Sequence, residues 1–345
     1  MACALIALLS ERPDFVATGT LFERPRQARQ PNLQLECAMH STDQYDRCPE
    51  FAVVSVNTPR RGAGRWRLGV SCAVLLLAGS AGAAYLALPD PVKPDPESRR
   101  LLPALDSVFL EDLTWMEVRD AQRAGKTTIV VATGGVEQNG PYLATGKHNI
   151  ILRGTTEAIA RRLGNALVAP IVPFVPEGDF SPPSLHMQYP GSVGVSEATF
   201  RALLSDMCES FKVTGFRHIV LVGDSGGNQE GMREVAEKLD QQWRGSGPRV
   251  VYIPEYWDYP GIERWLAEQG IRQVPEGLHD DFAITSQMLA LDPRSVRAEE
   301  RKQAGLFRIN GVDLAPQDQT ATWGRRIIDR RAEQTVAAIR KALAD

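Results

Sequence analysis

Three short stretches of this 345-residue chain combine acid, amide and imidazole side chains with glycines. The first, GGVEQNGPYLATGKHN (134–149), contains Glu137, the second is DSGGN (224–228), and the third, LHDD (278–281), contains His279. Carboxylate and imidazole groups are the side chains that bind divalent metals and transfer protons near neutral pH. These stretches therefore indicate metal or acid–base chemistry.

The surrounding sequence predicts an α/β fold that would bring these stretches together. Buried strands are predicted from apolar runs at 127–135, 166–175, 218–223 and 249–255. Amphipathic helices are predicted near 150–163, 196–213, 227–243 and 259–269, followed by two more at about 281–291 and 324–343. Apolar strands that alternate with helices are typical of a mainly parallel sheet covered on both faces. In such sheets functional groups gather at the carboxyl ends of the strands, where the first two stretches lie.

Composition excludes several classes of function and site. The formal net charge is -3 and no segment is strongly basic, so a nucleic-acid partner is not expected. Four of the five cysteines precede residue 73, which leaves Cys208 alone in the main body. An internal disulfide and a CxxC-type zinc or redox site are therefore excluded there.

The N-terminal part resembles a targeting segment more than a folded domain. An apolar run at 68–88 follows a basic stretch, which is typical of a signal peptide or a single transmembrane anchor. We expect the rest of the chain to be exported, either periplasmic or anchored to the inner membrane and facing the periplasm. The predicted organisation is a disordered or mis-annotated extension (1–65), the signal peptide or anchor (66–88), a Pro-rich linker (89–104) and a catalytic domain (105–345).

Four motifs in the predicted domain resemble the creatininase (creatinine amidohydrolase) family, in the same order along the chain. The 134–149 stretch is similar to that family's Glu-Gln-His-Gly-Pro-His-Leu signature. GFRHIVLVGDSGGN (215–228) is similar to its strand that leads into Asn-Gly-His-Gly-Gly-Asn. LHMQYPGSVGVSEATF (185–200) resembles its His-x-x-Phe-Pro-Gly segment, and LHDDFAITSQML (278–289) its His-Ala-Gly-Glu-x-Glu-Thr-Ser segment.

The resemblance implies a three-layer α/β/α sandwich and a homo-oligomeric, divalent-metal hydrolase of a cyclic amide or related C–N bond. Carried over by position, the family's metal-binding Glu falls on Glu137. Its bridging Asp falls on His148, and the His of its Gly-His-Gly-Gly segment falls on Asp224. The chain would thus keep one Glu, one His and one Asp for one metal. Such a set suits Zn, Mn or Fe(II).

The second metal site of the family is expected to be lost. Its His falls on Asn139, and its last-motif carboxylates fall on Phe282 and Ile284, which cannot bind a metal. The remaining ion would activate a water for attack on the substrate. His279 would act as general acid, oriented by Asp281 or Asp280.

Substrate contacts are predicted from residues near the same strand ends: Asn139, Tyr142, Asn228 and Trp257. Trp257 and its neighbour Tyr256 follow a strand, and their rings are expected either to stack on a flat substrate or to pack in the core. His186 is expected at the pocket mouth and His218 in a strand, neither as a ligand. Because Asn139 and Tyr142 alter the first loop, and because the domain is expected outside the cytoplasm, creatinine itself is not the expected substrate.

Three alternatives remain open on sequence grounds. Glu137 and Asp224 would serve only as helix caps, with His148 packed in a loop, if no metal binds. The chain would be a non-catalytic periplasmic small-molecule-binding or assembly protein if the fold persists without the chemistry. A peptidase-like member of the family, acting on a modified peptide, would need a wide, charged cleft.

Overall fold

The computed structural model describes residues 95–344. The predicted extension, the apolar segment and residues 89–94 of the predicted linker lie outside this range, and residues 95–104 contain no helix or strand. Within the described residues no helix is both long and apolar enough to cross a membrane.

A four-stranded parallel sheet forms the centre of the domain, with the strand order β2-β1-β3-β4. The strands are β1 (Thr128–Thr133), β2 (Ala166–Val168), β3 (His218–Gly223) and β4 (Arg249–Tyr252). In the register of the two central strands, Thr128 lies opposite His218 and Thr133 opposite Gly223. The carboxyl ends of β1 and β3 therefore lie side by side, as the sequence predicts.

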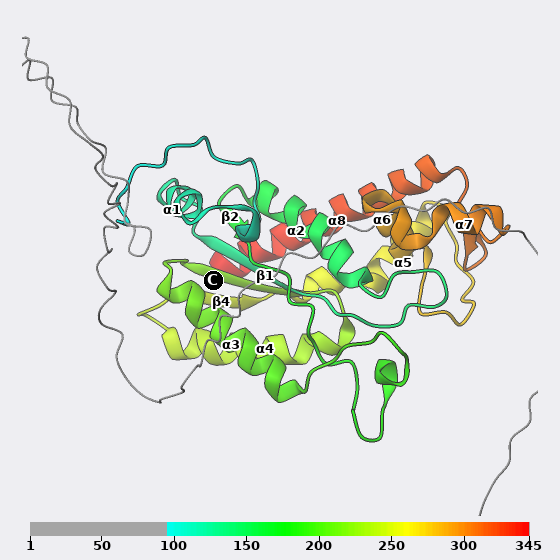
Figure 1. Cartoon of the computed structure of the whole chain (residues 1–345), viewed down its shortest axis with the longest axis horizontal. Helices are drawn as coiled ribbons and strands as arrows, with labels where there is room; N and C mark the ends of the chain where they lie inside the picture. The colour runs from blue at the N-terminus through cyan, green and yellow to red at the C-terminus, as the bar shows by residue number, and fades with distance from the viewer. Residues whose placement is uncertain (1–94, 345) are drawn as a thin grey trace, which may run out of the picture. The chain divides into compact units, whose positions relative to one another are not determined.

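Helices cover both faces of this sheet (Figure 1). On one face, α3 (Glu197–Val213) and α4 (Gln229–Trp243) pack on the side chains of Ile129 and Val131. On the other face, α2 (Lys147–Leu163) and α8 (Gln317–Ala344) pack on Val130 and Ala132. Successive residues of a strand point to opposite faces, so one apolar strand supplies both cores. This arrangement confirms the predicted α/β sandwich.

Three departures from the predicted elements have local causes. Strand β2 is shorter than the predicted 166–175 run because Pro170 and Pro173 cannot donate ladder hydrogen bonds. Helix α1 (Trp115–Arg123) was not predicted, although Thr114 and Glu117 form a capping box at its start. Helix α2 starts at Lys147, so His148 lies in its first turn rather than in a loop.

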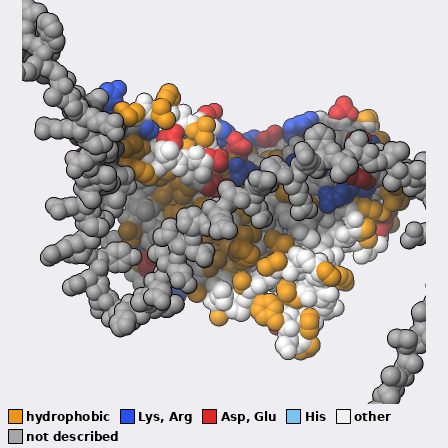
Figure 2. Space-filling model, in the orientation of Figure 1, with side chains coloured by type: hydrophobic (Ala, Val, Ile, Leu, Met, Phe, Trp, Pro, Cys, Tyr) orange, Lys and Arg blue, Asp and Glu red, His pale blue; other side chains and the backbone are white. Residues whose placement is uncertain are grey.

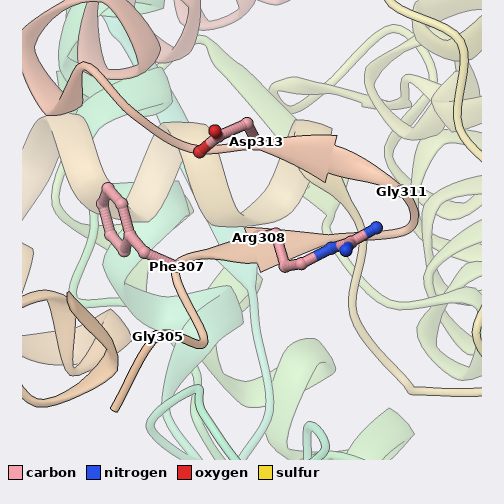
Figure 3. A pocket seen from close by; sticks show the side chains of 5 residues that line it. All are labelled: Gly305, Phe307, Arg308, Gly311 and Asp313. Atoms are coloured by element: carbon pink, nitrogen blue, oxygen red, sulfur yellow. The ribbon is translucent and has the colours of Figure 1, made fainter. Parts of the chain in front are cut away.

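A third apolar cluster holds together the helices beyond the sheet. These are α5 (Tyr259–Glu268), α6 (Phe282–Leu291) and α7 (Ala298–Gln303), next to a hairpin of β5 (Arg308–Ile309) and β6 (Val312–Asp313). A cavity of about 400 Å³ lies at this hairpin. It is lined by Arg308 and Asp313 with Gly305, Phe307 and Gly311 (Figure 3). None of the predicted site residues lines it.

The connection between β2 and α3, residues 169–196, is a long loop that includes the short 3-10 helix η2 (Leu185–Gln188). The remaining 3-10 helices are η1 (Leu110–Asp112), η3 (Gly226–Asn228), η4 (Pro254–Trp257) and η5 (Pro293–Val296). Apolar side chains gather on the projecting loop in Figure 2, and Phe180, Leu185 and Tyr189 are exposed there. We call residues 169–196 the β2–α3 connection.

Candidate functional site

The carboxylate of Glu137 lies at the centre of a group of basic side chains. It follows β1 and is 1% exposed. Its Oε1 lies 2.8 Å from His148 Nε2 and 3.1 Å from Lys147 Nζ, while its Oε2 lies 3.2 Å from His186 Nε2. Burial alone would raise the pKa of Glu137, but His148 and Lys147 outweigh it, so the pKa lies well below its ordinary value. Glu137 is therefore an anion in the folded protein.

Glu137 and His186 form a candidate metal-binding group together with His279. The ligand atoms of Glu137, His186 and His279 lie within 4.8 Å of one another. Glu137 Oε1 is 3.6 Å from His279 Nδ1, and the two imidazole rings stack with their centroids 4.6 Å apart. Ligands about 2.1 Å from a tetrahedral ion lie roughly 3.4 Å from each other. The Glu137–His186 spacing and the donor types fit a divalent ion.

His148 joins Glu137 to Asp224. Its Nε2 donates to Glu137 Oε1 and its Nδ1 donates to Asp224 Oδ2, each over 2.8 Å. Burial would lower the pKa of His148, but these two carboxylates raise it above the ordinary value. A ring with a carboxylate at each nitrogen is a protonated imidazolium.

Asp224 directly follows β3 and is fully buried. Its carboxylate accepts hydrogen bonds from Arg331 Nη2 over 2.5 Å, from the Tyr259 hydroxyl over 3.1 Å and from His148. Burial favours the neutral acid, but Arg331 and His148 outweigh that effect and hold the pKa of Asp224 below its ordinary value. The carboxylate is thus committed to side chains of the protein.

In this structure the three predicted ligands contact one another. Glu137, His148 and Asp224 do converge, but His148 lies between the two acids, and its two nitrogens face in different directions. One ion cannot bind all three donors in this arrangement, because the acids lie at opposite nitrogens of one ring. Neither acid caps a helix: the N-cap of α2 is Gly146 and that of α4 is Asn228, neither with a side-chain cap bond.

Glu177 is a second buried acid next to Glu137. It lies in the β2–α3 connection, is 3% exposed, and its Oε1 has no hydrogen-bond partner. Burial and the neighbouring Glu137 raise the pKa of Glu177 to about 9. A Cβ at Gly135 would lie 2.4 Å from this oxygen, so any other residue there would displace the Glu177 carboxyl group. Glu177 carries a proton at neutral pH.

His279, the predicted general acid, lies among the candidate ligands. Its Nδ1 donates to the backbone oxygen of Gln138 over 3.0 Å, which orients the ring. Burial lowers the pKa of His279 below its ordinary value, so the neutral ring is favoured. A neutral ring keeps a lone pair for an ion, whereas a nitrogen that binds an ion cannot deliver a proton.

The acids next to His279 serve the following helix instead. Asp281 is the N-cap of α6 and accepts from the backbone nitrogen of Ile284 over 2.6 Å. Asp280 accepts from Thr285 Oγ1 over 2.7 Å, and burial raises its pKa to about 7. The contact that orients His279 comes from Gln138 rather than from either predicted acid.

Two predicted substrate contacts are used within the protein. Asn139 is buried, and its Nδ2 donates to the backbone oxygens of Glu137 and Ala144 over 2.9 and 3.1 Å. Asn228 is also buried, and its Nδ2 donates to the backbone oxygen of Gly134 over 2.8 Å. These amides hold the loop after β1 and the turn after β3 in place.

The two predicted aromatic contacts, Tyr142 and Trp257, have different surroundings. The Arg301 guanidinium stacks on the ring of Tyr142, with its carbon 4.2 Å from the centroid. Trp257 is 37% exposed and lines a groove of about 770 Å³ together with residues of α8. Tyr256 is buried, and its hydroxyl shares a hydrogen bond with the hydroxyl of Thr155, so it belongs to the core.

Comparison with known proteins gives the family of this fold and site. Residues 111–339 match the family model described as creatinine amidohydrolase. The chain belongs to the creatininase family. Membership confirms the resemblance predicted from the four motifs and places the chain among amidohydrolases.

Two curated relatives of this creatininase-family chain have different activities. A creatinine amidohydrolase of Pseudomonas putida is 26% identical over 201 residues, which is 54% of this chain and 73% of the relative. A mycofactocin precursor peptide peptidase of Mycobacterium ulcerans (strain Agy99) is 23% identical over 226 residues, or 61% and 84% of the two chains.

Solved creatininase structures share the fold. A manganese form of creatininase superposes with a TM-score of 0.52 at 21% identity, covering 68% of this chain and 98% of that one. A mutant creatininase described as the Zn-Zn type gives 0.51 at 21% identity, covering 69% and 98%. At this identity the likeness supports the three-layer α/β/α architecture and nothing finer.

His186 was expected at the pocket mouth and not as a ligand, whereas the structure places it in the candidate metal-binding group. It is placed by η2 in the β2–α3 connection, where its backbone nitrogen donates to Glu177 over 3.1 Å. A signal existed, because His186 is the histidine of the HMQYPG segment that resembles the family motif. Its proximity to Glu137 could not be predicted, because the two residues lie far apart along the chain.

Proposed function

We propose that this creatininase-family chain is a metal-dependent hydrolase of amide C–N bonds that holds one divalent ion through Glu137, His186 and His279. The observation that carries the proposal is the convergence of these three donors within 4.8 Å. Two imidazoles and one carboxylate suit Zn, Mn or Fe(II) and leave coordination positions open. Cyclic amides are the proposed substrates, and a linear peptide amide is the second candidate because a relative is a peptidase.

The chain's own residues hold this group in a fixed geometry. His148 donates to Glu137 and is itself fixed by Asp224, so the carboxylate cannot rotate freely. Gln138 holds His279 by its Nδ1 proton. A bound divalent ion would supply Lewis acidity toward a carbonyl and an activated water. His148 and Gln138 thus fix the orientation of the proposed ligands Glu137 and His279.

The test is metal content together with hydrolysis by the full-length protein. We expect about one equivalent of Zn, Mn or Fe by elemental analysis, and release of product from cyclic amides. Glu137→Gln, His186→Ala and His279→Ala should each lose the metal and at least 100-fold of the activity. His218→Gln is the matched control, because this half-buried histidine starts β3 and lies at the opposite end of that strand from Asp224.

Other outcomes would point elsewhere. A metal-free protein that still binds small molecules would favour the non-catalytic alternative. Activity on linear peptides but not on cyclic amides would favour the peptidase. Export and homo-oligomer formation are further proposals from the sequence, which mass spectrometry of the mature N-terminus and light scattering test directly.

A further inference from the structure

Lys147 places a positive charge among the candidate metal ligands. Its side chain is 1% exposed, and its Nζ lies 3.1 Å from Glu137 Oε1 and 3.5 Å from His279 Nε2. An ammonium group has three donors and no acceptor, so it requires acceptor partners when buried. Its two hydrogen-bond acceptors, Glu137 Oε1 and His279 Nε2, are atoms that would also coordinate a metal ion.

Apart from the ion pair with Glu137, the position is unfavourable for a lysine in two respects. Lys147 is the first residue of α2, where the partial positive charge of the helix dipole repels a cation. Burial removes the ammonium from water, which is costly without a paired charge. Both effects disfavour the buried ammonium. The ion pair with the Glu137 carboxylate is therefore the interaction that holds this side chain in place.

The nitrogen of His279 that faces Lys147 is also the one available to an ion. Nδ1 donates to the Gln138 backbone oxygen, so Nε2 is left with the free lone pair in the neutral ring. Glu137 Oε1 and His279 Nε2 thus already point at a cation, the Lys147 ammonium. A divalent ion bound between the same atoms would meet a like charge at contact distance.

We propose that the Lys147 ammonium is a built-in competitor for the divalent ion: it occupies the cation position between Glu137 and His279 and weakens metal binding. The proposal rests on the proposed function, because it concerns the same ligands. An incoming ion must displace the ammonium from Glu137. A second ion next to the first is disfavoured for the same reason, so the chain binds one ion rather than a pair.

The test measures metal affinity in three full-length proteins: the wild type, Lys147→Gln and Lys147→Arg. Zn²⁺ and Mn²⁺ are titrated against a chelator, with stoichiometry measured by elemental analysis. Lys147→Gln should bind at least tenfold more tightly than the wild type, because the competing charge is gone while an amide donor remains for Glu137. Lys147→Arg, which keeps the charge, should show no such gain.

Thermal unfolding gives a second readout that does not depend on activity. Without metal, Lys147→Met should unfold at a lower temperature than the wild type, because Glu137 loses a buried partner. Saturating Zn²⁺ should raise its unfolding temperature by more than it raises that of the wild type. This variant also serves if the glutamine variant folds poorly.

The outcomes separate this proposal from the proposed function. Unchanged or weaker binding by Lys147→Gln, with one metal bound by the wild type, overturns the competitor role and leaves the metal site intact. If Lys147→Gln binds metal and the wild type does not, the competitor role is supported. The proposal that the wild type is a metal-dependent hydrolase is then overturned. If neither protein binds metal, both proposals are overturned.

Discussion

Arg331 and Asp224 form a fully buried ion pair, with Nη2 of the guanidinium 2.5 Å from Oδ1 of the carboxylate. The guanidinium also lies over the rings of Tyr256 and Tyr259, 4.2 and 4.8 Å from their centroids. The pair joins α8 to the end of β3. It explains why Asp224, at a typical ligand position, is occupied by the protein itself.

Removing the arginine should destabilise the fold strongly. Arg331→Met would leave Asp224 buried without its main countercharge, and breaking such a pair costs about 3–5 kcal/mol. Chemical denaturation of the full-length protein measures this loss. Arg325→Met, an exposed residue on the same helix, is the control and should stay within about 0.5 kcal/mol of the wild type.

The double variant Arg331→Met with Asp224→Asn separates pairing from packing. Because it removes both charges, it should lose less stability than the two single changes added together. Strict additivity of the two losses would show that the ion pair contributes nothing beyond packing.

Glu177 should make the metal-free protein less stable as the pH rises. Its folded pKa, about 9, lies above the ordinary value of 4.5, so the folded state holds a proton that the unfolded chain releases. Its contribution is complete below about pH 4.5 and is lost as the pH rises toward 9, at roughly 1.4 kcal/mol per pH unit.

Glu177→Gln has no proton to lose and should remove this dependence. In the presence of a chelator it should exceed the wild type in unfolding free energy by about 3–5 kcal/mol at pH 8 and match it near pH 4. Denaturation across this range is the measurement. A constant difference between the two proteins at all pH values would rule out titration of Glu177.

His148 should contribute stability on the acid side of its raised pKa. The folded pKa lies above the ordinary value of 6.5, so the contribution is full below that value and falls as the pH rises through the folded pKa. With a chelator present, the gap in unfolding free energy between the wild type and His148→Gln should shrink by at least about 1 kcal/mol from pH 6 to the alkaline end. A gap that widens instead would contradict an imidazolium at this position.

The crossing of α6 and α8 depends on Gly324. A Cβ at this position would lie 1.9 Å from the backbone oxygen of Ser286, so the helices would have to move apart. Gly324→Ala should therefore cost about 1–3 kcal/mol or more, despite the better helix propensity of alanine. Glu333→Ala, exposed on the same helix, should leave the denaturation midpoint nearly unchanged.

The sequence was sufficient to predict the sheet and the positions of Glu137, His148 and Asp224 near each other. Strand runs such as 218–223 are apolar throughout, and a parallel sheet places the residues that follow them at one edge. The roles of these residues could not be predicted, because they depend on partners far along the chain. Arg331 lies 107 residues after Asp224, and no local pattern pairs them.

The candidate ligand group of the structure differs from the predicted one for a similar reason. Exchange of His and Asp between two loops conserves donor types, but donor types do not show which way each nitrogen points. His148 uses both nitrogens for carboxylates, whereas His186 and His279 come from other segments and complete the group. No local pattern singles out Lys147, because the sequence predicts it in a loop, where a lysine is ordinarily solvated.

The β2–α3 connection supplies both His186 and Glu177. Its first part is tied to the sheet, because Ala169 and Val172 donate to the backbone oxygens of Val130 and Ala132 in β1, whereas Glu177 and His186 lie beyond these contacts. These two residues meet Glu137, which follows β1, and His279, which precedes α6, so the candidate group is assembled from three separate segments of the chain. A chimera that replaces residues 169–196 with those of a relative would therefore exchange one candidate ligand and its buried acidic neighbour while Glu137 and His279 stay as they are.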